Sequence, residues 1–200
     1  MALSDGEPAS GDDVWFRIAT HKDYIKNGRV LHGAFGGRAI AAPSAEKRRG
    51  WDRELSGRLR SLSGSVSDIA THAEQFCHDQ TALGGGTKIF HGVMYSRVAE
   101  IKSTYKNAIV SNVHFTPNPP SDPAHSDLTF TGWNINTRPE LEEFTIWVSD
   151  HLHALYPAQL EAHLPDARSD GSVAPAAAAI LSVLRRLAEK ARSLTSKFTT

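Results

Sequence analysis

The chain has 200 residues, enough for one domain with its own core and without the support of a metal or a disulfide. Its 22 lysine and arginine residues equal its 22 aspartate and glutamate residues, and this balance argues against nucleic acid as the main ligand. The single cysteine, Cys77, excludes an intramolecular disulfide and a Cys-rich zinc site and fits a reducing compartment.

The sequence contains no pattern of a secretion signal or a membrane span. Its first ten residues lack a basic start followed by an apolar core, and the longest apolar runs are far shorter than a membrane crossing requires. We therefore expect a cytoplasmic protein. Residues 1–13 are polar and contain Gly, Pro and Ser, which predicts a flexible N-terminus.

The first half of the chain predicts a strand, a turn and two helices. An apolar run begins at Val14, and Asn27-Gly28 is a strong turn dipeptide. Residues 51–62 space Trp51, Leu55, Leu59 and Leu62 as on one helical face, so a short helix is expected there. A second helix is expected over residues 65–78, with a serine cap and an apolar stripe made of Ile69, Ala73, Phe76 and Cys77.

The second half predicts three strands and another helix. Strands are expected over residues 89–98, 108–115 and 128–135 because these segments are rich in β-branched and aromatic residues. A helix should begin at Arg138-Pro139 and end at Pro157. Its buried stripe would contain Leu141, Phe144, Trp147, Val148, His151, Leu152 and Leu155.

These elements predict a single α+β domain over residues 14–164, with a small mixed or antiparallel sheet packed by three or four helices. Residues 165–176 have the composition of a linker. Residues 177–196 are predicted to form an amphipathic C-terminal helix, which packs on the domain, binds a protein partner or remains an exposed tail.

The segment from Asn112 to Leu128 contains the candidate binding loop. Its four prolines restrict the backbone and leave three polar side chains, Asp122, His125 and Asp127, on a stiff support. Either aspartate could orient His125 as a general base. The alternative is that the strand needs a rigid exit and that His125 caps or packs locally.

The glycine, histidine and cysteine motifs of the chain do not predict a phosphate-binding loop, a metal site or a reactive thiol. The glycine segments at residues 33–38 and 83–87 match no phosphate-binding loop and are interpreted as turns. The histidines near Cys77 have the wrong helical spacing for a metal site, so no metal is expected. Cys77 itself should be a buried, inert thiol with a raised pKa. The sequence leaves the cofactor unassigned.

Four segments together resemble a family of small uncharacterised bacterial proteins that occur near conflict and defence genes. They are Arg17, the GRVLHGAF block at residues 28–35, the LSG at residues 55–57 and the NPPSDPAHSDL block at residues 118–128. The resemblance covers roughly residues 14–130 and implies no settled reaction. It implies an early arginine, a Gly-Arg-Val-x-x-x-Ala-Phe block and an Asn-Pro-x-x-x-Pro-Ala-His block in that order.

The chain is also similar, in its early arginine and its Gly-rich aromatic segment, to enzymes that cleave or transfer from NAD. That similarity implies that Arg17 holds a pyrophosphate and that Phe35 stacks on the nicotinamide. Glu100 or Glu142 would then stabilise the oxocarbenium-like centre.

Two hypotheses for the function follow. The first is an accessory or regulatory component of a bacterial conflict or defence system that acts through protein contacts, with the C-terminal helix as the contact. The alternative is a small effector enzyme, a hydrolase or transferase, that acts on a nucleotide or nucleic-acid bond with Arg17, His91 and His125. The sequence leaves open whether the protein is catalytic. A shared pocket for these three residues would favour the enzyme.

Overall fold

The computed structural model describes residues 3–36, 39–45, 49–84, 86–118 and 121–166. The chain divides into a unit of residues 1–167 and a unit of residues 168–200, and all described residues belong to the first. The expected amphipathic helix at residues 177–196 and most of the expected linker at residues 165–176 lie outside the described residues.

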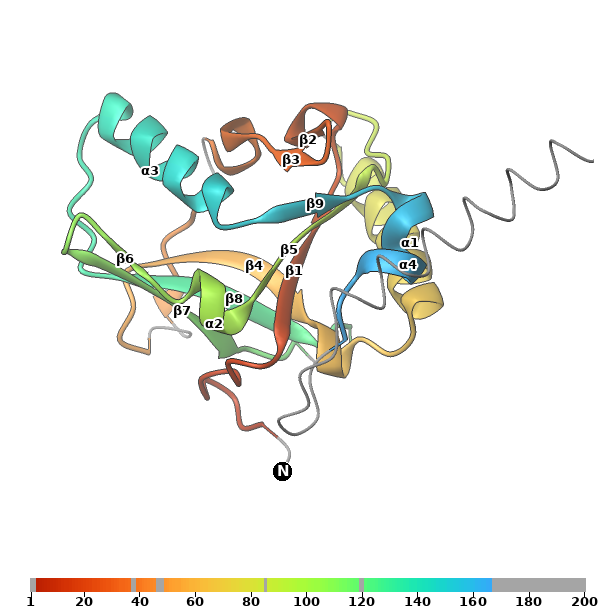
Figure 1. The fold of residues 1–200 in the computed structure, drawn as a ribbon, viewed down its shortest axis with the longest axis horizontal. Coiled ribbons are helices and arrows are strands. Elements are labelled where there is room, and N and C mark those ends of the chain that lie inside the picture. Colours follow the sequence, from red (N-terminus) through yellow and green to blue (C-terminus); the bar gives the residue numbers. More distant parts are fainter. Residues whose placement is uncertain (1–2, 37–38, 46–48, 85, 119–120, 167–200) are drawn as a thin grey trace, which may run out of the picture. The chain divides into compact units, whose positions relative to one another are not determined.

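In the described residues, nine strands form one sheet, and every pair of neighbouring strands is antiparallel (Figure 1). The strand order is β2-β3-β9-β5-β1-β4-β8-β7-β6. The strands are β1 (Val14–Ala19), β2 (Ile25–Lys26), β3 (Arg29–Val30), β4 (Arg53–Leu59), β5 (Gly92–Arg97), β6 (Thr104–Tyr105), β7 (Ile109–Phe115), β8 (His125–Thr131) and β9 (His153–Leu155).

The sheet dominates the fold, so the expected small sheet packed by three or four helices is wrong. In the described part of the chain, only two α-helices are longer than about one turn, α1 (Val66–Ala82) and α3 (Arg138–Asp150). The helices α2 (Val98–Ile101) and α4 (Leu160–His163) have four residues each. Short 3-10 helices occur at Lys22–Tyr24, His32–Phe35, Arg60–Leu62 and Pro157–Gln159.

Strand β4 replaces the helix that was expected over residues 51–62. Leu55, Gly57 and Leu59 alternate along the strand and are all buried. A spacing of four residues fits a strand as well as a helix, because it is a multiple of the strand period of two. A Cβ atom on Gly57 would lie 2.4 Å from Trp15 Cε2, so the glycine provides space for the Trp15 indole of the neighbouring strand.

The end signals of the two long helices are confirmed at their N-termini. Ser65 and Asp68 form a capping box at the start of α1, and Thr137 and Glu140 form another at the start of α3. The prediction that the helix starting at Arg138 continues to Pro157 is wrong. The chain leaves α3 at Asp150 and enters β9, since the apolar residues that follow pack along β5 as a strand.

Other local predictions are confirmed. Asn27 and Gly28 have φ angles of 51° and 72° and connect β2 to β3, as a tight hairpin turn requires. The three predicted strands of the second half correspond to β5, β7 and β8, although β8 spans His125–Thr131 in place of residues 128–135. Residues 1–13 were expected to be flexible. Within them, the Gly6 and Ala9 amides donate hydrogen bonds to β7 carbonyl groups.

The sheet buries apolar side chains on both faces. On one face the core joins strand residues to Phe144 and Val148 of α3; the strand residues include Trp15, Leu55, Leu59, Val113, Leu128 and Phe130. A second, smaller cluster joins strand residues to residues of α1 and α4; its members are Phe16, Ile69, Val93, Leu155, Leu160 and Leu164. None of the helices in the described part has the length and apolarity needed to cross a membrane.

The sheet opens between β1 and β4, and this opening positions the site. β1 pairs with β5 along its whole length but with β4 only at Trp15 and Phe16. Further along β4, Ala41 takes over as the backbone partner, at Glu54. In the interval between these contacts, the guanidinium of Arg17 donates a hydrogen bond to the Ser56 carbonyl oxygen at 2.5 Å. A charged side chain therefore occupies a place where backbone pairing is interrupted.

Candidate functional site

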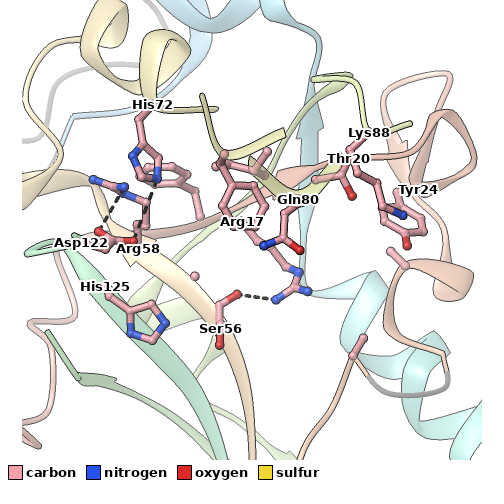
Figure 2. A pocket seen from close by; sticks show the side chains of 16 residues that line it. Arg17, Thr20, Tyr24, Ser56, Arg58, His72, Gln80, Lys88, Asp122 and His125 are labelled. Carbon is pink, nitrogen blue, oxygen red and sulfur yellow. Dashed lines mark hydrogen bonds and ion pairs between the residues drawn. The ribbon is translucent and has the colours of Figure 1, made fainter. Parts of the chain in front are cut away.

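A pocket of about 470 Å³ lies at this opening of the sheet. One part of its lining comes from β1 and β4, and another comes from α1. Figure 2 shows His72, Arg58 and Asp122 grouped at one end of the pocket and Tyr24, Thr20 and Lys88 at the other, with Arg17 between them. The volume is within the range of small-molecule sites.

Arg17 is the central cation of the pocket. Its side chain extends from β1 and is half-buried. Burial lowers the pKa of Arg17, and the nearby Tyr24 phenol and Asp127 carboxylate act in the opposite direction. Because arginine titrates far above physiological pH, the guanidinium keeps its charge. One of its nitrogens donates to Ser56, which holds the planar group in place.

One end of the pocket contains a polar cluster made of Arg58, Asp122 and His72 (Figure 2). Arg58 Nη1 lies 3.1 Å from Asp122 Oδ1, and both side chains are largely buried. His72 Nε2 lies 4.0 Å from the second oxygen of Asp122. The pKa of His72 is lowered, first by burial and then by the Arg58 charge, so the ring is neutral at pH 7.

His125 is oriented by Thr116 and, through it, by Asp127. His125 Nδ1 donates to the Thr116 carbonyl oxygen at 2.8 Å, since a carbonyl only accepts. The Thr116 hydroxyl donates to Asp127 Oδ2 at 2.7 Å. In its neutral form the ring carries its proton on Nδ1 and its lone pair on Nε2, and Nε2 lies 3.8 Å from Asp127 Oδ1. Asp127 is 1% exposed, so this support is buried behind the pocket.

The charges on the lining favour an anion. Among the lining residues that the structure describes, Arg17, Arg58 and Lys88 are cationic, and Asp122 supplies the one carboxylate. Lys88 is held near α1, because its backbone amide donates to the Thr81 hydroxyl at 2.8 Å. Cations that converge on a concave surface concentrate their field there.

The structure brings together only some of the predicted site residues. Arg17, Asp122 and His125 line the pocket, and Asp127 lies behind His125. Of the two aspartates proposed to orient His125, Asp127 approaches its Nε2 directly at 3.8 Å and also accepts from Thr116, whereas Asp122 pairs with Arg58. His91 is not among the lining residues; its backbone amide donates to the Ala19 carbonyl.

Several lining residues were missed at the level of sequence. His72, Phe76 and Gln80 are four residues apart on α1 and face the pocket together, a spacing that could have revealed them. Phe76 was expected in the buried stripe, but it is 37% exposed, because the buried face of α1 is formed by Ile69, Ala73 and Cys77. Arg58 and Lys88 carry no local signal.

Two further sequence interpretations can be compared with the structure. Cys77 is buried and burial raises the pKa of its thiol, as predicted. The NAD-type assignment is wrong for Phe35, which is fully buried and cannot stack on a ligand. Glu100 and Glu142 are not pocket-lining residues.

No group of three or more His, Cys, Asp or Glu side chains within the described ranges is arranged to hold a metal ion. No protein-family model, curated protein or solved structure matches the chain. The geometry of the pocket is therefore the feature of this protein that points to a function.

Proposed function

We propose that this protein binds a small anionic, phosphate-bearing molecule in the pocket between β1, β4 and α1. One observation carries the proposal: three cationic side chains from separate segments of the chain line one cavity with a single described carboxylate. Arg17 is the anchor, because a guanidinium held by Ser56 presents its other donors in a fixed plane that suits phosphate oxygens.

His125 extends the proposal from binding to catalysis. Its Nε2 lone pair can accept a proton from a bound hydroxyl or water, with Thr116 and Asp127 keeping the ring oriented. The predicted effector enzyme, a hydrolase or transferase that acts on a nucleotide or nucleic-acid bond, then uses Arg17 for binding and His125 as the base. Lys88 lines the pocket, whereas His91, the third residue named for the enzyme, does not.

The accessory role in a conflict or defence system is a separate prediction. It rests on the family resemblance and on residues 177–196, which lie outside the described residues. A ligand-binding pocket is compatible with that role, since a regulatory protein also needs a site for its signal.

Calorimetric titration with inorganic pyrophosphate tests the proposal. We expect Lys88→Met to weaken binding by roughly 10- to 100-fold, the effect of losing one charged hydrogen bond. The matched control is Lys26→Met, since Lys26 is exposed on the β2–β3 hairpin and is not a lining residue. Lys88 is preferable to Arg17 because Arg17 also bridges two strands. Equal affinity in both variants, or no binding at millimolar pyrophosphate, would contradict the proposal.

A further inference from the structure

An exposed aromatic ring lies among the cations of the pocket. Phe76 lines the pocket and is 37% exposed, although it belongs to a helix whose buried face is complete without it. The next pocket residue toward the start of α1 is His72, whose ring lies 6.5 Å from the Phe76 ring at an interplanar angle of 22°. Two nearly parallel flat rings therefore lie side by side on the face of α1 that lines the pocket.

A polar group follows on the same stripe. Gln80 lies one turn beyond Phe76 and also lines the pocket. Its side-chain amide offers both donors and an acceptor, the combination that the edge of a nucleobase requires. The cations Arg17 and Lys88 line the same cavity (Figure 2). The pocket thus combines a flat apolar surface, an amide and positive charges.

We propose that the anionic ligand is a nucleoside phosphate, with its base stacked on Phe76 and its phosphate bound by Arg17 and Lys88. The inference rests on the proposed function, because it identifies the ligand class of the same pocket. Bases stack on aromatic side chains through their π-faces, and the interaction tolerates different bases. The cavity of about 470 Å³ is of the size that small-molecule ligands occupy.

The alternative ligand is a sugar phosphate or another small anion that uses the cations alone. Such a ligand would have no need of Phe76, so the aromatic ring separates the two classes. A nucleoside without phosphate would use the ring and lose the cations. The nucleoside phosphate is favoured because it uses both sets of groups.

Calorimetric titration with four nucleoside 5′-monophosphates, ribose 5-phosphate and adenosine tests the inference. The nucleotides carry adenine, guanine, cytosine or uracil. We expect at least one of them to bind about 5-fold or more tighter than ribose 5-phosphate. Phe76→Ala should weaken that nucleotide by about 5- to 100-fold and leave ribose 5-phosphate unchanged. Phe76→Trp should retain the nucleotide, because it keeps an aromatic face.

Ile146→Ala is the matched control, since Ile146 is 42% exposed on α3 and does not line the pocket. It should leave every affinity unchanged, and a thermal unfolding curve of Phe76→Ala checks that the variant is folded. If ribose 5-phosphate binds in a Lys88-dependent way and no nucleotide binds better, the inference fails and the proposed function stands. If no phosphate compound binds, both fail.

Discussion

Gly57→Ala should destabilise the protein strongly, because the glycine provides the space in which the Trp15 indole packs. A Cβ at this position would lie 2.4 Å from Trp15 Cε2 and Cζ2 and 2.6 Å from Nε1. Both residues are buried, and Trp15 is 0% exposed, so the indole has no solvent into which it can move. Overpacking of this kind costs about 1–3 kcal/mol, and the rigid ring places the substitution near the upper limit.

A loss of about 3 kcal/mol corresponds to a fall in Tm of about 6–12 °C for a domain of this size. Urea unfolding followed by far-UV circular dichroism measures the free energy of unfolding without depending on tryptophan emission. The control is Gly33→Ala, where a Cβ meets no heavy atom within 4 Å, so the stability should be unchanged or slightly raised.

A double-mutant cycle identifies the cause. Trp15→Phe removes part of the ring that the new Cβ would meet, so its own cost should be smaller in the Gly57→Ala background. The coupling between the two substitutions should reach about 0.5–3 kcal/mol, as for residues in direct contact. If Gly57→Ala is as stable as the wild type, or if the two effects simply add, the packing account of β4 is refuted.

Three further predictions concern α1, pH and the pocket. Ser65→Ala removes the capping box of α1 and should cost about 1 kcal/mol in chemical unfolding, whereas Ser67→Ala, two residues later, should cost less; equal costs would contradict the capping assignment. Burial lowers the pKa of His72 and of His114, so the unfolded chain binds more protons than the folded protein below about pH 6.5, and the free energy of unfolding should fall on acidification from pH 7. In urea titrations, the double variant His72→Gln/His114→Gln should show a smaller fall than the wild type. An unchanged fall would exclude these two rings as its source. Asp122→Asn releases Arg58 from its ion pair and should raise the affinity for pyrophosphate by about 5-fold in calorimetry; weaker binding would mean that Asp122 contacts the ligand favourably.

Local signals in the sequence predicted those parts of the fold that short-range chemistry controls. The Asn27-Gly28 turn follows from two adjacent residue types that tolerate a positive φ angle, and both residues have a positive φ in the structure. The start of α1 follows from a serine cap, which is Ser65, and the start of α3 follows from Pro139 in its first turn. These features require no knowledge of distant segments, and the structure confirms them.

The extent of the sheet could not be predicted, because it depends on long-range pairing. Strands β2, β3 and β6 have two residues each, too few for any periodicity to be visible. The prediction of a helix over residues 51–62 was wrong because leucines four residues apart fit the helical period and the strand period equally well. Only the packing of the Trp15 ring shows why Gly57 belongs in a strand. The helix expected to run to Pro157 failed because β9 pairs with β5.

The sequence by itself determined the candidates for the site: Arg17 on an early strand, and Asp122, His125 and Asp127 around the proline loop. Only the tertiary structure decided which of them meet. Arg17 and His125 line one pocket, Asp127 supports His125 from behind, and His91 is not part of the lining. The physical reason is that the pocket forms where β1 and β4 stop pairing and α1 lies nearby, an arrangement of segments far apart in sequence that no local pattern encodes.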